Sequence, residues 1–330
     1  MRAETRENTF TTETWSVIHA LSPEDSAAMT TLRSGIAAMK GKLEGVSARG
    51  PFNGIMERVA VPGGVTFEAD TVGDIYGWWA KPAQAIKGAA ILHLHGGWFN
   101  WGTAQAFRNL VGHIATAGGS DAFIPDYRLA PEHPFPAAPE DVRATYFGLI
   151  ERGFTKVAVT GDSAGGNLAL GLLGFLKTSS ASAMSAIVGS VALSPITDLS
   201  LTGRSWLTRA VADPYFTQPQ VTELVRSYLN GHDAFDPLAS PLNADLAGFP
   251  PLRVHVGDDE VLLGDSVRFV EQAVAAGVDA RVDVWEGMVH GFLGAVGRLE
   301  AATESLNLIG KFLAERFAAA PSSERQRVNA

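Results

Sequence analysis

Short apolar runs and longer amphipathic stretches alternate along most of the chain. The apolar runs are rich in aliphatic residues, which is typical of buried strands. They cover residues 89–94, 121–125, 157–160, 187–193, 252–256 and 280–285. Because helical patterns fall between most of them, we expect an α/β fold with a mostly parallel central sheet and helices on both faces. Strand-like pieces in residues 55–80 are expected to pair antiparallel at the start of the sheet.

The first 48 residues show a helical pattern instead. Ser22-Pro23-Glu24-Asp25 is a good helix start, with serine at the N-cap, proline at the first helical position and an acid at the third. Apolar residues then recur three or four positions apart, at Met29, Leu32, Ile36, Met39 and Leu43. Such a segment either packs on the core or covers a pocket as a lid, and the pattern alone leaves both options open.

Residues 200–232 interrupt the alternation with a second apolar helical stretch. We interpret this stretch as an insertion after a strand and as a second piece of the lid. The chain then divides into five parts. These are an N-terminal helical cap segment (1–50), a first core part (51–199), the cap insertion (200–232), a second core part (233–318) and a flexible polar tail (319–330).

Composition narrows the range of partners and of chemistry. The net charge is −9, with no cluster of Lys or Arg, which argues against nucleic acid and anionic membrane as partners. No apolar run approaches the roughly 20 residues that span a bilayer, and the charged N-terminus shows no signal-peptide pattern. Cysteine is absent, so disulfides and thiol nucleophiles are excluded. We expect a cytoplasmic protein, and the oligomeric state is left open, with a homodimer as one option.

The stretch Gly161-Asp162-Ser163-Ala164-Gly165-Gly166 joins a β-branched run to a long apolar one. A serine on a tight strand-to-helix turn projects its hydroxyl from the carboxyl edge of the sheet, and flanking glycines let neighbouring backbone come close. The N–H of Ala164 opens the helix and faces whatever the serine attacks. This G-x-S-x-G pattern predicts Ser163 as a nucleophile.

A serine hydroxyl is a weak nucleophile and needs a base that a third group orients. In this topology an acid and then a histidine follow the serine along the chain. After Ser163, His232 lies in a loop of the insertion and His255 inside an apolar strand, which favours a structural role for His255. His290 follows the strand that ends at Trp285, at the same edge of the sheet as the serine, so we predict it as the base.

The acid is expected after the strand 252–256, where Asp258, Asp259 and Glu260 stand in succession. Asp265 falls on the following helix. The role requires a carboxylate that accepts the Nδ1–H of the histidine and stabilises the imidazolium. Spacing alone leaves the first three carboxylates open.

Donors for a developing oxyanion are expected where a glycine turn follows the strand 89–94. One such donor is worth roughly 2.7–4 kcal/mol in the transition state. The candidate donors are the backbone N–H groups of Gly96, Gly97, Trp98 and Ala164. His95 in the same turn has no second ligand at metal spacing, so we predict no metal site.

Taken in order, these stretches form a specific pattern. They are His95-Gly96-Gly97-Trp98, Asp126-Tyr127-Arg128-Leu129-Ala130-Pro131-Glu132, the Gly161–Gly166 turn, the acidic loop and His290-Gly291-Phe292. Together they resemble the hormone-sensitive-lipase family of α/β-hydrolases, in its microbial carboxylesterase branch, over residues of about 55 to 318. The resemblance implies an α/β-hydrolase fold with a helical cap and hydrolysis of carboxylic esters through an acyl-enzyme, without a cofactor.

The resemblance also bears on single residues. The family's acid is commonly followed by any residue and then leucine, which here fits only Glu260, so the resemblance implies Glu260. Trp98 stands where the family's turn usually has glycine or alanine, and its indole must find room in the substrate pocket. We expect Arg128 to pair with Glu132 in a structural loop. Asp162 either supports the oxyanion turn or is a solvated carboxylate of its own turn, and the sequence leaves both options open.

The function so implied is that of a serine carboxylesterase for small to medium uncharged esters beneath an aromatic-rich lid. The candidate pocket residues are Trp98, Trp101, Trp206, Tyr215 and Phe216. A lactonase, an amidase or an acyltransferase would use the same catalytic residues. A non-catalytic ligand-binding relative is a further alternative, which the presence of His290 argues against.

Overall fold

The computed structural model describes residues 14–179 and 181–319, and its centre is one nine-stranded sheet. The strands are β1 (Ser16–His19), β2 (Val65–Val72), β3 (Ile75–Pro82), β4 (Ala89–Leu94), β5 (Asp121–Pro125), β6 (Lys156–Asp162), β7 (Ile187–Leu193), β8 (Leu252–Gly257) and β9 (Ala280–Trp285). They lie in the order β1-β9-β8-β7-β6-β4-β5-β3-β2. Neighbours from β1 to β5 run parallel, whereas β3 pairs antiparallel with both β5 and β2. The predicted mostly parallel sheet with an antiparallel start is confirmed.

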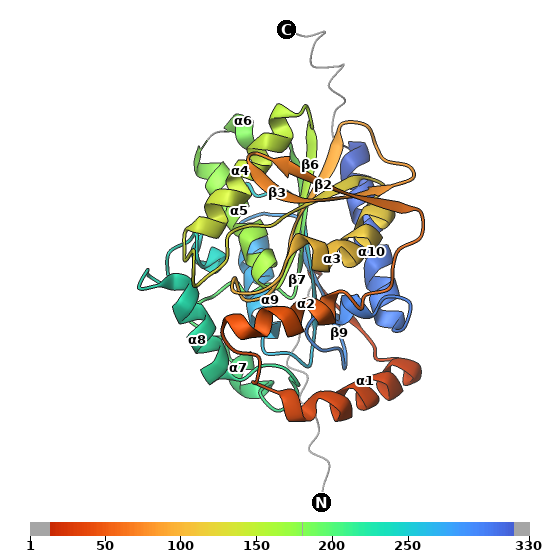
Figure 1. Cartoon of the computed structure of the whole chain (residues 1–330), viewed down its shortest axis with the longest axis vertical. Helices are drawn as coiled ribbons and strands as arrows, with labels where there is room; N and C mark the ends of the chain where they lie inside the picture. Colours follow the sequence, from red (N-terminus) through yellow and green to blue (C-terminus); the bar gives the residue numbers. More distant parts are fainter. Residues whose placement is uncertain (1–13, 180, 320–330) are drawn as a thin grey trace, which may run out of the picture.

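Helices cover both faces of this sheet (Figure 1). They are α1 (Pro23–Ile36), α2 (Arg49–Met56), α3 (Ala104–Gly118), α4 (Ala137–Glu151), α5 (Ala164–Ser179), α6 (Ala181–Met184), α7 (Ser205–Thr208), α8 (Gln218–Leu229), α9 (Leu263–Ala275) and α10 (Glu300–Ala319), with 3-10 turns at Ala37–Met39, Val46–Ala48, Pro241–Asn243 and Phe292–Ala295. Side chains of α3 and α10 share one buried apolar cluster with the strands, and those of α4, α5 and α9 share another. Both faces are thus sealed, as strands with nearly continuous apolar sequence require.

The N-terminal segment contains a strand that the helical pattern did not predict. β1 lies at the edge of the sheet, parallel to β9, with His19 opposite Trp285. The Nε2 of His19 bonds the carboxylate of Asp283 at 2.8 Å, and its ring stacks on Trp285 at 3.9 Å. The expectation of helix throughout residues 1–48 is wrong here, because a four-residue edge strand is too short to show a periodicity of its own and forms by pairing with β9. Residues 1–13 lie outside the described part of the chain.

The predicted start of the next helix is confirmed. Ser22 is the N-cap of α1, and its Oγ accepts the backbone N–H of Asp25 at 3.1 Å. The helix ends at Ile36, earlier than the apolar spacing through Leu43 indicated. The chain turns at Gly41, whose φ of 72° lies in the left-handed region.

The helices α1, α2, α7 and α8, hereafter the cap layer, gather at one end of the molecule, in the lower half of Figure 1. α7 and α8 fall inside the predicted insertion 200–232. α2 spans Arg49–Met56 and so crosses the predicted boundary at residue 50. The cap layer is therefore built from two separate parts of the chain, and its first part extends further than the composition change at residue 51 indicated.

The end of the chain is helical up to the last described residue. β8, α9, β9 and α10 make up the predicted second core part, and α10 runs through Ala319. The rest of the predicted tail, residues 320–330, lies outside the described residues. Within residues 14–179 and 181–319, no helix combines the length and the apolar character needed to cross a membrane.

Candidate active site

Ser163 occupies a sharp turn between β6 and α5. Its φ is 56°, in the left-handed region that residues other than glycine rarely adopt. Glycines make this turn sterically feasible: a Cβ on Gly161 would lie 2.2 Å from the carbonyl oxygen of Gly165. A Cβ on Gly165 would lie 1.9 Å from the carbonyl oxygen of Leu94. The turn therefore holds the hydroxyl of Ser163 at the N-terminus of α5, where backbone N–H groups and the helix dipole favour negative charge.

The carboxylate of Glu260 contacts the imidazole of His290. Its Oε2 lies 2.6 Å from the Nδ1 of His290. Its Oε1 accepts the hydroxyl of Ser194 and the backbone N–H of Gly257, each at 2.7 Å. Glu260 is fully buried, so both oxygens depend on these partners. Because a carboxylate only accepts, Nδ1 of His290 carries the proton, and Nε2 of the neutral ring is the nitrogen that can take one.

The neighbouring carboxylates have other partners. Asp258 accepts the backbone N–H of Gly287 at 2.6 Å. Asp259 forms an ion pair with Arg33 of α1 at 2.8 Å. Of the three carboxylates that spacing left open, Glu260 is the one in contact with the histidine.

The charges around His290 favour its protonated form. Burial by itself disfavours the imidazolium, but the charge and the hydrogen bond of Glu260 oppose this effect, and the charges of Asp213 and Asp162 add to them. The net result is a pKa of His290 raised above its ordinary value of 6.5. A larger share of the imidazole is therefore protonated at a given pH than in an isolated histidine.

Asp213 is a residue of this site that the sequence analysis missed. Its buried carboxylate accepts the backbone N–H groups of Tyr215 and Phe216 at 2.8 and 3.0 Å. The other oxygen accepts the N–H of Val261 at 2.9 Å. Asp213 thus ties the insertion to the residue that follows Glu260. An aspartate that caps its own following backbone in a turn is a recognisable signal, but its second partner is 48 positions away along the chain.

Arg33 joins the cap layer to the same loops. Its guanidinium donates to the carboxylate of Asp259 at 2.8 Å and to the carbonyl of Gly287 at 3.3 Å. It also donates to the carbonyl of Ala212 in the insertion. The position of α1 is therefore coupled to the insertion, to the acidic loop and to the loop before His290.

The glycine turn after β4 carries strained backbone. Gly97, Trp98 and Phe99 all have positive φ, at 119°, 54° and 61°. The N–H groups of Gly97, Trp98 and Ala164 have no acceptor within residues 14–179 and 181–319. Strained backbone and open donors, here in the glycine turn and at the start of α5, mark a functional position.

The N–H of Gly96 is not available in the way that the sequence analysis predicted. It donates to the Oδ1 of Asp162 at 3.0 Å. A donor held by a carboxylate cannot also serve an oxyanion, so Gly96 leaves the set of candidate donors. The same contact confirms that Asp162 supports the turn, and a Cβ on Gly96 would lie 2.3 Å from the Oδ2 of that carboxylate.

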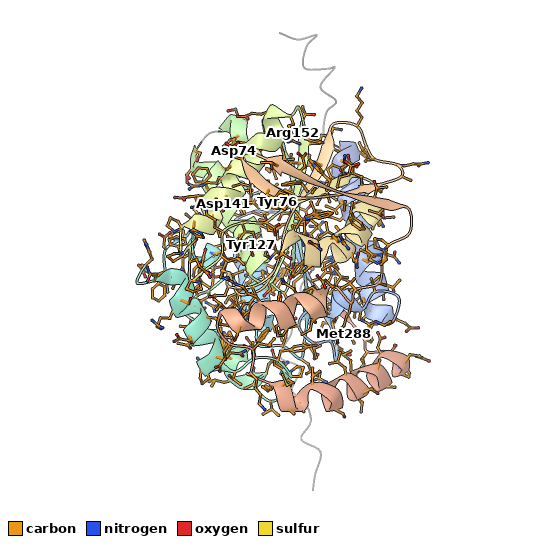
Figure 2. The ribbon with its side chains drawn as sticks, viewed as in Figure 1. Asp74, Tyr76, Tyr127, Asp141, Arg152 and Met288 are labelled. Carbon is orange, nitrogen blue, oxygen red and sulfur yellow. The ribbon has the colours of Figure 1, made fainter. Side chains whose placement is uncertain are left out.

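His95 has a structural environment. The hydroxyl of Tyr127, labelled inside the molecule in Figure 2, donates to the carbonyl of His95 at 2.6 Å, and the two rings stack at 4.3 Å. The Nδ1 of His95 lies 2.9 Å from the carbonyl oxygen of Gly96. Across the described ranges, no three His, Cys, Asp or Glu side chains gather as a group that could hold a metal ion.

The predicted pairing of Arg128 with Glu132 is wrong. Arg128 binds Asp141 of α4 at 2.7 Å, and Asp141 is labelled in Figure 2. Glu132 binds Arg49 at the start of α2 instead, at 2.6 Å. Asp141 is buried and needs a cation, whereas Glu132 is half exposed, so the helix rather than the loop attracts the Arg128 guanidinium.

A cavity of about 540 Å³ lies between the cap layer and the carboxyl ends of the central strands. Most of its lining is apolar, and Ser163, His290, Gly97 and Trp98 all reach it. Of the predicted pocket residues, the cavity is lined by Trp98, Trp101, Tyr215 and Phe216. Trp206 does not line it and packs behind Trp98, with the ring centres 6.4 Å apart. The volume matches the sites that proteins use for small molecules.

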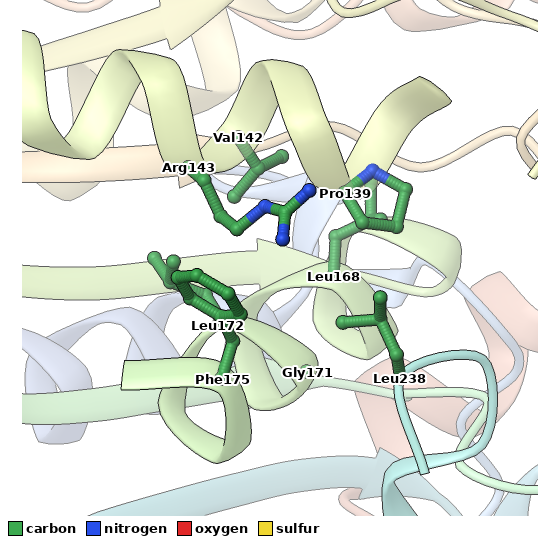
Figure 3. A pocket seen from close by; sticks show the side chains of 8 residues that line it. All are labelled: Pro139, Val142, Arg143, Leu168, Gly171, Leu172, Phe175 and Leu238. Atoms are coloured by element: carbon green, nitrogen blue, oxygen red, sulfur yellow. The ribbon is translucent and has the colours of Figure 1, made fainter. Parts of the chain in front are cut away.

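A second hollow lies between α4 and α5 and is far smaller, about 10 Å³ (Figure 3). Arg143 lies across the ring of Phe175 there, with its guanidinium carbon 4.4 Å from the ring centre. Such a space holds about one water molecule. The cavity at Ser163 is therefore the candidate site.

Comparison with known proteins gives the family of the chain. A family model described as alpha/beta hydrolase fold matches residues 91–294. The chain is 36% identical to an acetyl-hydrolase of Streptomyces hygroscopicus over 222 residues, which cover 67% of this chain and 73% of that protein. It is 36% identical to an esterase of Acinetobacter venetianus over 213 residues, which cover 64% and 69%. The chain is thus an α/β-hydrolase.

A solved structure narrows this class. An esterase from the bacterial hormone-sensitive lipase family superposes with a TM-score of 0.83 at 34% identity, covering 90% of this chain and 99% of that one. The chain belongs to the hormone-sensitive-lipase family of α/β-hydrolases and is a carboxylic-ester hydrolase. The predicted fold class and family are confirmed.

Proposed function

We propose that this chain is a serine carboxylesterase that hydrolyses small to medium uncharged esters through a covalent acyl-enzyme. The observation that carries the proposal is the 2.6 Å contact between Glu260 and the Nδ1 of His290, on the same cavity as Ser163. With Nδ1 protonated, Nε2 is the atom that takes the proton from the hydroxyl of Ser163.

The reaction then proceeds in two halves. The Oγ of Ser163 attacks the ester carbonyl carbon while His290 takes its proton, and His290 next protonates the leaving alcohol. In the second half, His290 takes a proton from water, the hydroxide attacks the acyl-enzyme, and the acid leaves as Ser163 regains its proton. Glu260 holds the imidazole in the required tautomer and stabilises the imidazolium in both halves.

The oxyanion of each tetrahedral intermediate accepts hydrogen bonds from the backbone N–H groups of Gly97, Trp98 and Ala164. Their lack of other acceptors in the described chain supports this role. The support of the turn by Asp162, through the N–H of Gly96, keeps these donors in place before the charge develops. Donors fixed in advance stabilise the transition state without a cost of reorganisation.

The cavity supports the choice of substrate class. Its volume of about 540 Å³ and its mostly apolar lining suit an uncharged ester of modest size, because burying an unpaired charge there is costly. Trp98 and Phe216 meet edge to face at 5.1 Å beside the site and narrow the space around the ester. A relative that is named an acetyl-hydrolase supports short acyl groups.

The test is hydrolysis of p-nitrophenyl esters, from acetate to long acyl chains, by the native protein and by the Ser163→Ala variant. We expect activity on the shorter esters that disappears in the variant, while its thermal unfolding stays close to that of the native protein. A folded native protein without activity on any ester, or full activity in Ser163→Ala, would overturn the proposal. Lactone and anilide substrates in the same assay separate an esterase from a lactonase or an amidase.

A further inference from the structure

The inner wall of the cavity carries a polar pair that the proposed reaction does not use. His255 of β8 and Ser305 of α10 both line the cavity, and both are buried. In the sheet, Asp162 is in register with Leu193, and Leu193 is in register with His255. His255 therefore stands two strand spacings, roughly 9.5 Å, from the residue before Ser163. A substrate held at the nucleophile has this wall within its reach.

The hydrogen bonds of His255 determine which of its nitrogens accepts. Burial lowers the pKa of His255 to about 4, so the ring is neutral near pH 7 and one nitrogen must be an acceptor. The indole Nε1 of Trp285 lies 3.3 Å from its Nδ1, and the Oγ of Ser305 lies 3.1 Å from the same atom. An indole N–H can only donate, so Nδ1 is the acceptor. Its single lone pair takes one well-aligned hydrogen bond.

The hydroxyl of Ser305 is the group with spare hydrogen-bonding capacity. The indole N–H of Trp285 has no second acceptor in the described chain, whereas a hydroxyl rotates freely about its C–O bond. When Trp285 occupies the lone pair of His255, the proton of Ser305 is free to turn to the cavity. Thr303, on the same helix, shows the usual alternative, because its hydroxyl donates to the carbonyl of Leu299.

Three other polar side chains that line the cavity are already engaged. Ser194 donates to Glu260, and Asp162 holds the glycine turn. Gln220 of α8 donates to the carbonyl of Leu43. Ser305 differs from these three, because its partner His255 already has another donor.

The charge behind the wall is balanced. The Oδ2 of Asp283 lies 3.9 Å from the Nε2 of His255. Asp283 is paired with His19 at 2.8 Å and with Arg281 at 3.0 Å. A further anion would be repelled by this carboxylate, and a cation would meet a carboxylate that already has partners. The wall suits an uncharged polar group.

We propose that Ser305, beside His255 on the cavity wall, forms a subsite that binds an uncharged hydroxyl or carbonyl oxygen at the far end of the ester substrate. The subsite rests on the proposed function, since it takes Ser163 as the point at which the ester is held. The backbone separation of roughly 9.5 Å between Asp162 and His255 sets the scale of the distance between the nucleophile and this subsite. The substrate class is therefore an ester that carries an uncharged polar oxygen several atoms from its carbonyl.

The test compares esters that differ only in a terminal hydroxyl. One series pairs methyl ω-hydroxyalkanoates with methyl alkanoates, and the other pairs diol monoacetates with alkyl acetates, each over chain lengths around this span. The two series separate the acid half from the alcohol half of the ester. The quantity measured is the ratio of kcat/KM for the hydroxylated ester to that for its plain partner. It is measured in the native protein and in the Ser305→Ala and Ser190→Ala variants.

Ser190→Ala is the matched control, because Ser190 is a buried serine on β7 that does not line the cavity. We expect Ser305→Ala to lower the ratio about three- to tenfold in one series at one range of lengths, which is the effect of one hydrogen bond. Ser190→Ala should leave the ratio unchanged. If Ser305→Ala does not fold, Ser305→Cys keeps the shape with a weaker donor and should lower the same ratio.

Two outcomes overturn the subsite. One is a ratio that Ser305→Ala leaves unchanged at every length in both series, and the other is an equal change in Ser190→Ala. Either result, with activity that still depends on Ser163, leaves the proposed function standing. Activity that survives Ser163→Ala would instead remove the proposed function itself.

Discussion

Replacing Glu260 by glutamine tests the site at its most specific contact. The amide has the shape of the carboxylate, and its oxygen can keep the bonds from Ser194 and Gly257, both of which are donors. Its NH₂ group must then face the Nδ1 of His290. Because the amide donates there, Nδ1 becomes the acceptor and the proton moves to Nε2. The nitrogen that should take the proton of Ser163 is then already protonated.

The expected loss follows from this change of tautomer. The equivalent change of acid to amide in a serine-protease triad lowers kcat by about 10⁴-fold. At 1.36 kcal/mol per factor of ten, this is about 5.4 kcal/mol of transition-state stabilisation. Two of the three hydrogen bonds of Glu260 survive, so the free energy of unfolding should change by no more than about 1–2 kcal/mol.

The assay is steady-state hydrolysis of p-nitrophenyl acetate, with thermal unfolding as the control for folding. Asp259→Asn and Asp258→Asn are the matched variants, since they make the same chemical change one and two positions earlier. We expect each of them to retain kcat within about tenfold, because they bond to Arg33 and Gly287 and not to His290. A Glu260→Gln variant with near-native kcat, beside an Asp259→Asn variant that loses 10³-fold or more, would refute this reasoning.

Three further predictions concern charge, coupling and packing. Activity needs His290 in its neutral form, so kcat/KM should rise with pH, with a midpoint above pH 6.5. Asp213→Asn should move this midpoint to lower pH, because the substitution removes a negative charge that raises the pKa of His290. Arg33→Met, which removes the bond between α1 and Asp259, should lower kcat about tenfold with little change in KM. Arg49→Met, which removes the ion pair between α2 and Glu132, should leave kcat unchanged. If Arg33→Met changes only the melting temperature, α1 is not coupled to catalysis. Gly165→Ala should lower the free energy of unfolding by about 1–3 kcal/mol, seen as a lower melting temperature, or prevent folding. Gly174→Ala lies in the same helix, where a new Cβ meets nothing closer than 3.8 Å, and it should leave the melting temperature unchanged or raise it.

Local pattern was enough where the chemistry depends on neighbours in the sequence. The turn around Ser163 and the N-cap at Ser22 were both predicted, because a turn or a cap involves residues a few positions apart. β1 was missed, since a four-residue strand exists through its pairing with β9, which lies some 260 residues further on. Arg128 was assigned to the nearest glutamate in sequence, but its partner lies on α4.

The two errors share one cause. Sequence spacing shows which groups are close along the chain, and an ion pair or an edge strand depends on which groups are close in space. Asp213 and Arg33 were overlooked for this reason, since each acts on loops more than 40 positions away. Whether a backbone N–H is available also depends on contacts in space. The N–H of Gly96 looked suitable as an oxyanion donor from the sequence, but in the structure it donates to the carboxylate of Asp162.

The sequence by itself determined the α/β architecture, the strand–turn–helix around Ser163 and the candidates for base and acid, because these follow from periodicity and from chain order. Tertiary structure alone decided which of three adjacent carboxylates contacts His290, which backbone N–H groups remain open, and that Trp206 stands behind the cavity rather than in it. The physical reason is that a hydrogen bond forms only when donor and acceptor lie within about 3 Å of each other. Neighbouring residues of one loop point in different directions and so reach different partners at that distance.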